Sequence, residues 1–223
     1  MPNDVYLEIG SKRVFACSLD WPGWCRSGRD EHAALQALAE YASRYRRAVG
    51  AAGKGFTASS LRVVERVKGN ATTDFGAPGV PAKRDDRPLS PARVKRQTAL
   101  LRATWAAFDR MARGARGTDL RKGPRGGGRD LDAIVRHVLE ADLAYLSKLG
   151  AKSRNPASIK DVRSEMTAMR KDVVALVASR SKGEPPPRTP RSGSLWSPSY
   201  AIRRSAWHAL DHAWEIEDRS GRA

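Results

Sequence analysis

Two short stretches of alternating apolar and polar residues open the chain, from Val5 to Ile9 and from Arg13 to Leu19, joined at the tripeptide GSK. Successive side chains of a strand point to opposite faces, so this pattern predicts a β-hairpin. Apolar residues then recur at helical spacing within residues 29–49 and predict a helix. The segment from Leu61 to Val67 predicts one more strand. We therefore expect residues 1–68 to form a small α+β module.

The pattern changes after residues 69–89, which are rich in Gly, Pro and Asp and predict a linker. Long stretches with helical spacing follow within residues 89–115, 129–150, 158–181 and 199–219. Ser90 and Pro91 form a helix start signal, and Gly150 is placed to end the second helix. Four helices of about 20 residues with polar connections predict an all-α four-helix bundle over residues 90–223.

The charge balance adds a candidate partner to this picture. The 223 residues carry a formal net charge of +17, which attracts phosphate polyanions regardless of their sequence. Much of the charge lies in loops at residues 113–130 and 179–194, which lack the aromatic side chains that stack on bases. The net charge makes nucleic acid a candidate partner, and the lack of aromatic residues in these loops makes it the alternative rather than the favoured one.

The same composition bears on the compartment. No run of about 18 apolar residues predicts a membrane span, so we expect no membrane partner. The first residues lack the apolar core of a signal peptide, which predicts a cytoplasmic protein. The only cysteines, Cys17 and Cys25, are eight positions apart and do not have the spacing of a zinc-finger motif. We expect both to be reduced thiols, and Cys25 to be buried and inert.

Histidines carry the clearest chemical signal. His208 and His212 are four residues apart in the last predicted helix, so both rings project from one face beside its apolar stripe. His137 lies on the second helix of the predicted bundle among small apolar residues. Three neutral imidazoles bind zinc or nickel and leave positions for water, so these residues predict a divalent-metal site. The alternative is a set of half-buried histidines that hydrogen-bond to backbone or carboxylate groups.

Two further residues near this pattern have open roles. Glu215 lies on the same side of the helix as the histidine pair. It is a candidate general base, an acceptor that orients a ligand, or an exposed partner of Arg219, the last being favoured. His32, the fourth histidine, is expected at the surface.

The segments DAIVRHVLEADLAYLSKLG and SYAIRRSAWHALDHAWEIEDR, with one His on the second helix and HxxxH on the fourth, resemble the DinB superfamily. This superfamily is related to the YfiT-like and mycothiol-dependent maleylpyruvate isomerase proteins. The likeness covers about residues 90–220. It implies an up-down-down-up four-helix bundle with a divalent metal held by His137, His208 and His212. Members with an assigned reaction tend to be low-molecular-weight-thiol transferases or isomerases.

Residues 5–68 resemble the HicB antitoxin core in their strand, PG turn and following helix. The chain departs from that pattern at DWPGWC, and no catalytic residues are carried over. A module of this kind commonly mediates association or covers a neighbouring site, and a homodimer is one expected assembly.

Together these features predict a metal-dependent thiol transferase or hydrolase that acts on a small molecule or a low-molecular-weight thiol. The alternatives are a non-catalytic regulatory or nucleic-acid-binding protein of the stress response and a part of a toxin–antitoxin assembly.

Overall fold

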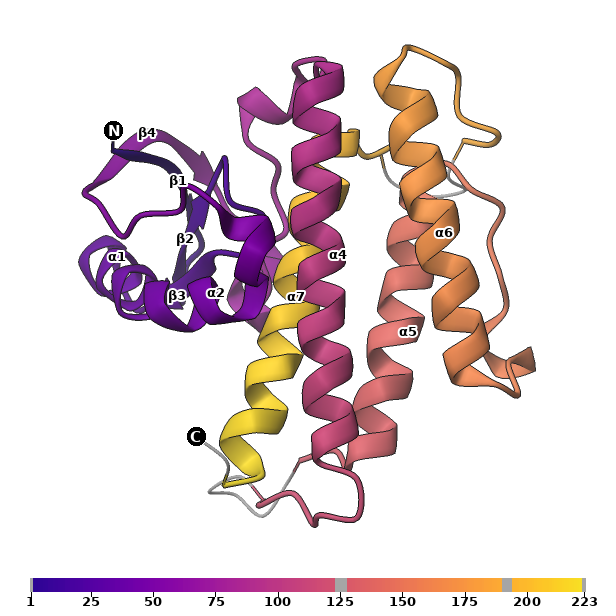
Figure 1. Cartoon of the computed structure of the whole chain (residues 1–223). Coiled ribbons are helices and arrows are strands. Elements are labelled where there is room, and N and C mark those ends of the chain that lie inside the picture. The colour runs from indigo at the N-terminus through magenta and orange to yellow at the C-terminus, as the bar shows by residue number, and fades with distance from the viewer. Residues whose placement is uncertain (1, 123–127, 190–193, 222–223) are drawn as a thin grey trace.

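The computed structural model describes residues 2–122, 128–189 and 194–221, and it places a four-stranded mixed sheet before a series of helices (Figure 1). The strands are β1 (Asn3–Ile9), β2 (Val14–Ser18), β3 (Cys25–Gly28) and β4 (Leu61–Lys68). The helices are α1 (Glu31–Glu40), α2 (Ala42–Val49), α3 (Ala71–Phe75), α4 (Pro91–Gly114), α5 (Leu131–Lys148), α6 (Val162–Ser181) and α7 (Pro198–Arg219). Short 3-10 turns occur at η1 (Gly50–Gly53), η2 (Lys83–Asp86) and η3 (Pro156–Ser158).

The sheet has the strand order β3-β2-β1-β4. The predicted hairpin is confirmed, since β1 and β2 pair antiparallel with Val5 opposite Ser18. The predicted strand at Leu61 is also confirmed, and it pairs parallel with β1 at the edge of the sheet. The pattern did not indicate β3, because its four residues, CRSG, are too short and too polar to show alternation. The parallel β1–β4 pair is joined through helices α1 and α2, as such pairs require.

The helix expected over residues 29–49 is interrupted, so its predicted continuity is wrong. Helix α1 begins at Asp30, whose carboxylate accepts a hydrogen bond from the backbone NH of Ala33. The break falls at Tyr41, the residue between α1 and α2. The Tyr41 ring packs against Trp214 of α7, with 5.1 Å between the ring centroids. The break therefore coincides with the place where this segment contacts the last helix.

Four long helices were predicted after residue 89, and four are present. Helix α4 starts as expected, with Pro91 in its first turn and the Ser90 hydroxyl accepting from the backbone NH of Arg93. Gly150 follows the end of α5 with a φ of 107°, which favours glycine. α4, α5, α6 and α7 lie side by side and share one apolar core (Figure 1). Helix α7 contacts α4, α5 and α6 within this group.

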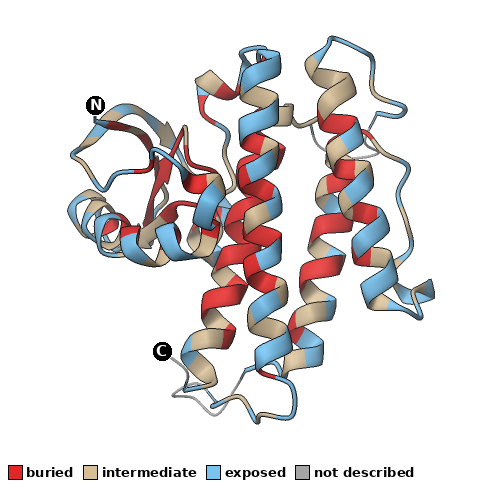
Figure 2. Cartoon of the chain, in the orientation of Figure 1, coloured by how far each residue is buried: buried red, intermediate tan, exposed pale blue. Residues whose placement is uncertain are grey.

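Helix α7 is buried on nearly every side (Figure 2). Its small apolar residues face the core shared with the other long helices, whereas Leu210 and Trp214 pack with the sheet and with α1 and α2. Arg44 of α2 forms ion pairs with Glu217 and Asp218 near the end of α7. The N-terminal part therefore covers the side of α7 that the other long helices leave open.

Residues 69–89, predicted as a linker, contain α3 and η2 and two buried polar residues, Thr73 and Asp85. Asp85 is 3 % exposed and pairs with the buried Arg203 of α7. Thr73 donates to the buried carboxylate of Glu8. The ion pair between Asp85 and Arg203 thus connects this segment to α7.

The basic loops predicted at residues 113–130 and 179–194 lie partly outside the described residues, which omit 123–127 and 190–193. Among the helices that are described, none combines the length and apolar character needed to cross a bilayer.

Candidate metal centre

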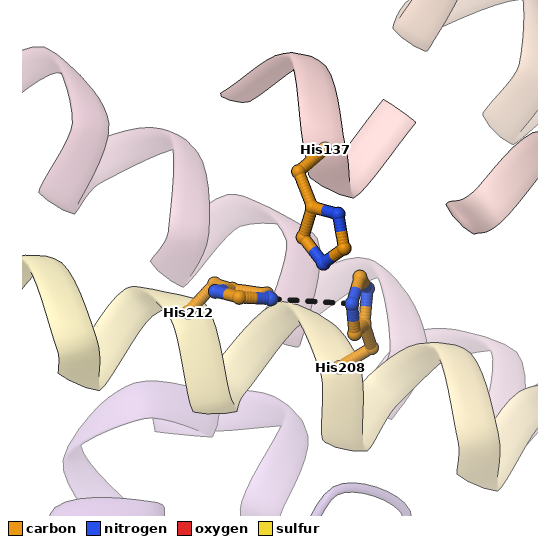
Figure 3. Close-up of side chains that lie close together, drawn as sticks. All are labelled: His137, His208 and His212. Atoms are coloured by element: carbon orange, nitrogen blue, oxygen red, sulfur yellow. Dashed lines mark hydrogen bonds between the residues drawn. The ribbon is translucent and has the colours of Figure 1, made fainter. Parts of the chain in front are cut away.

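The three predicted histidines come together between α5 and α7 (Figure 3). His137 lies in the second turn of α5, a helix capped by Asp130, whose carboxylate accepts from the backbone NH of Ala133. His208 and His212 lie one turn apart on α7. The helix spacing places their rings on the same side, so the sequence pattern is sufficient to bring this pair together. The packing of α5 against α7 adds His137.

The distances between the rings are those of a compact group. One ligand atom from each histidine can be chosen so that all three lie within 4.8 Å of one another. Nε2 of His208 is 3.2 Å from Nε2 of His212. The centroid of the His137 ring is 5.2 Å from that of His208 and 4.9 Å from that of His212. The three histidines therefore lie close enough to hold one metal ion.

Glu215 contacts the group through His212. Its Oε2 atom lies 2.7 Å from Nδ1 of His212, and its Oε1 atom accepts from Arg219 at 2.7 Å. Burial acts to raise the pKa of Glu215, but the contacts with His212 and Arg219 outweigh it and the pKa is lowered. Two of the roles considered for Glu215, acceptor for a histidine and partner of Arg219, are thus filled together.

His137 and His208 lie in an environment that favours their neutral form. His208 is 5 % exposed and His212 is 9 % exposed. Burial lowers the pKa of His208 well below its usual value, and the nearby charges of His212 and Arg204 lower it further. Burial and the charge of His212 also lower the pKa of His137. Nδ1 of His208 is buried and has no hydrogen-bond partner among the described residues.

Aromatic side chains and one arginine surround His208. The ring of Tyr145 on α5 lies 5.7 Å from the His208 ring, and that of Trp207 lies 6.1 Å from it. The Arg204 guanidinium packs over both aromatic rings, 4.8 Å from the centroid of Tyr145 and 4.6 Å from that of Trp207. Arg204 is only 7 % exposed, and none of the ion pairs within the described ranges involves it. The buried carboxyl of Asp142 interacts with it electrostatically, since the Arg204 charge acts to lower the pKa of Asp142.

Sequence reasoning found the histidines but missed Arg204 and Tyr145. Arg204 is four residues before His208, the same spacing that links His208 to His212. On a helix this spacing places Arg204 on the same side as the histidine pair, so the sequence does contain a signal for it. Tyr145 lies on a different helix, and only the packing of α5 on α7 brings it near. His32 is exposed, as expected for a residue outside the site.

Comparison with protein families, with characterised proteins and with solved structures finds no significant match to this chain. The DinB and HicB likenesses therefore rest on the motifs of the sequence.

Proposed function

We propose that this protein is a DinB-like metalloenzyme in which His137, His208 and His212 hold a divalent ion, zinc or nickel. Its reaction is thiol transfer to, or hydrolysis of, a small molecule, with a low-molecular-weight thiol as cosubstrate in the first case. The observation that carries this proposal is the convergence of three imidazoles from two helices, with ligand atoms within 4.8 Å of one another.

The donor set fits such an ion. Imidazole nitrogens suit zinc and nickel, and three protein ligands are the usual number at zinc sites that keep a position for water or substrate. Tetrahedral zinc with Zn–N bonds of about 2.0–2.1 Å separates neighbouring ligand nitrogens by about 3.3 Å. The Nε2 atoms of His208 and His212 are already 3.2 Å apart.

The surroundings of the three rings leave nitrogen lone pairs free to bind a metal ion. The contact between Nδ1 of His212 and the Glu215 carboxylate places the proton of this ring on Nδ1 and leaves Nε2 as the lone-pair atom. The lowered pKa values of His137 and His208 keep these rings neutral near pH 7, as metal binding requires. A divalent ion with three imidazole ligands acidifies bound water or a bound thiol toward neutral pH.

Arg204 and Tyr145 supply groups that can hold a substrate beside the histidines. Burial raises the pKa of Tyr145 to about 12, so the phenol keeps its proton at pH 7 and can donate a hydrogen bond. The Arg204 guanidinium offers a fixed positive charge next to it. Both groups suit a substrate with a negatively charged or carbonyl oxygen.

The arrangement of the long helices supports the DinB-like part of the proposal. In Figure 1, α4 and α7 run in one direction, and α5 and α6 run in the other. These directions are those of the up-down-down-up bundle that the resemblance implies. We therefore propose that α4 to α7 form that bundle, with the metal between α5 and α7.

Metal analysis of protein purified without an affinity tag tests the site. We expect about one zinc or nickel ion per chain in the wild-type protein. His208→Ala should lose it, whereas the matched control His32→Ala should keep it. Metal retained by His208→Ala would overturn the assigned site.

The catalytic part of the proposal has its own test. We expect the wild-type protein to consume a low-molecular-weight thiol in the presence of an alkylating electrophile, or to hydrolyse an ester, and to lose this activity on chelation. Two results together would favour the alternative function instead: the wild-type protein contains no metal, and it binds nucleic acid with an affinity that falls steeply with salt. In that case His208→Ala should bind nucleic acid as the wild-type protein does.

A further inference from the structure

The two cysteines face each other across neighbouring strands. Cys17 on β2 is the register partner of Cys25 on β3 in an antiparallel pair. Their sulfur atoms are 2.8 Å apart, about 0.8 Å more than a disulfide bond. The backbone NH of Ser18 donates to the carbonyl of Trp24, so the neighbouring Cys17–Cys25 position is the one where opposed side chains approach most closely. Cα atoms at such positions are about 4.5 Å apart, within the range of about 4.4–6.8 Å that a disulfide needs.

The dithiol borders a small internal space. Cys17 is 2 % exposed and Cys25 is 5 % exposed, and both line a cavity of about 10 Å³. A cavity of this size has room for about one water molecule. A reagent that reaches the sulfurs through it has to be close to water in size, which excludes bulky disulfides.

Two arginines of α7 line the same cavity. Arg203 is paired with Asp85, but Nη1 of the buried Arg204 has no hydrogen-bond partner among the described residues. A guanidinium beside a thiol favours the thiolate, which is the nucleophilic form of cysteine.

The two sulfurs are not equivalent in this surrounding. Burial is the main cause that raises the pKa of Cys25, and the contact with Cys17 adds to it. Cys25 is therefore the thiol that keeps its proton, which leaves Cys17 as the sulfur that reacts first.

We propose that Cys17 and Cys25 form an oxidisable dithiol that closes to an intramolecular disulfide when hydrogen peroxide reaches the sulfurs, with Cys17 as the attacking sulfur and Cys25 as the resolving thiol. In the first step Cys17 forms an S–O bond, the O–O bond breaks, and hydroxide leaves with the Cys17 proton as water. In the second step the sulfur of Cys25 attacks that of Cys17, the S–S bond forms, and the S–O bond breaks. The proton of Cys25 leaves with the hydroxyl group as a second water. The two sulfurs lose two electrons in total, and the peroxide is reduced to two waters.

This proposal goes beyond the metal centre and does not depend on it. It also revises the expectation that Cys25 is inert, while the expected burial of Cys25 is confirmed.

Hydrogen peroxide added to the native wild-type protein tests the disulfide. After unfolding and alkylation, we expect a monomer that has lost two hydrogen atoms, with both cysteines protected, and recovery of both thiols with a dithiol reductant. Two alkylated cysteines, sulfinic acid, or a disulfide that links two chains would overturn the proposal.

Single substitutions test the assigned order. In Cys25→Ser treated with hydrogen peroxide and then unfolded in the presence of dimedone, Cys17 should be labelled as a trapped sulfenic acid. In the matched variant Cys17→Ser, Cys25 should remain unlabelled over the same time. Labelling of Cys25 alone would overturn the roles. If circular dichroism shows that a serine variant does not fold, the corresponding alanine variant replaces it. The measurement on the wild-type protein tests disulfide formation without any variant.

Discussion

Nδ1 of His212 lies 2.7 Å from Oε2 of Glu215, and as a result Nε2 of His212 is the nitrogen that faces His208. Arg219 donates to the other carboxylate oxygen of Glu215 at 2.7 Å. The carboxylate is therefore held from both sides, which suits a group that orients a ligand better than one that moves protons.

The first prediction concerns this orienting contact. Removing it in Glu215→Ala should weaken zinc binding by about 10–100-fold, because partners of ligating histidines typically have effects of this size. Competition with a chromophoric chelator measures the affinity. Glu217→Ala is the matched control, since Glu217 lies on the same helix but pairs with Arg44 of α2. Equal affinities of Glu215→Ala and the wild-type protein would contradict the assigned role.

The second prediction follows from the lowered pKa of His208. In the folded protein this ring stays neutral, whereas in the unfolded chain it gains a proton as the pH falls through about 6.5. The unfolded state therefore binds more protons, and His208 makes the metal-free protein lose stability as the pH falls below that value. His208→Asn removes this loss. Its free energy of unfolding relative to wild type should rise by about 1.4 kcal/mol between pH 7.5 and pH 5.5.

Urea unfolding of metal-free protein, with a chelator present, measures this change. The control His32→Asn replaces an exposed histidine and should not show a rise of this size. A relative stability of His208→Asn that does not depend on pH would show that His208 is protonated equally in both states.

Local spacing explains how much of the site the sequence could predict. His208 and His212 are neighbours on any helix, and the apolar stripe beside them indicates which side faces other helices. The capping signals at Ser90 and Pro91 are equally local, and they placed the start of α4 correctly.

What could not be predicted depends on packing between distant segments. The sequence of α7 indicates one apolar face, yet the helix is buried nearly all round because the sheet and α2 cover its other side. No local sequence pattern in α7 indicates that the sheet and α2 pack on this second side. For the same reason Arg203 and Arg204 look like surface residues in the sequence but are buried, one against Asp85 and the other against Tyr145.

The third prediction concerns the buried carboxylate of Asp142 on α5, which is 1 % exposed. Burial raises its pKa to about 7, although Arg170 and Arg204 act against the shift. An acid with a raised pKa destabilises the fold as the pH rises from about 4 to 7, because the unfolded chain releases the proton more readily. Asp142→Asn should therefore stabilise the protein at pH 8, by on the order of 2 kcal/mol, and the gain should shrink toward pH 4.

Denaturant unfolding at pH 8 and pH 4.5 checks this expectation. Asp132→Asn is the control, since Asp132 is exposed in the first turn of the same helix. A loss of stability at pH 8 in Asp142→Asn would mean that the ionised carboxylate is needed by the two arginines.

The last prediction concerns Gly23, in the turn that joins β2 to β3. Gly23 has a φ of 92°, and a Cβ atom there would lie 2.9 Å from Cδ1 of Leu210 and 3.2 Å from the carbonyl oxygen of Ala206. Both contacts belong to α7 and flank His208 along the chain. Gly55 has a similar φ of 85° but open space around it, so Gly55→Ala measures the backbone strain alone. Such strain costs about 1–2 kcal/mol.

Gly23→Ala should lose about 1–2 kcal/mol more than Gly55→Ala in urea unfolding, because it also forces the turn away from α7. The added loss should be accompanied by weaker zinc binding, since the turn covers the segment of α7 that carries His208. Equal losses in the two variants would mean that the turn can move from α7 without cost. In that case the N-terminal part would not help to position the histidines.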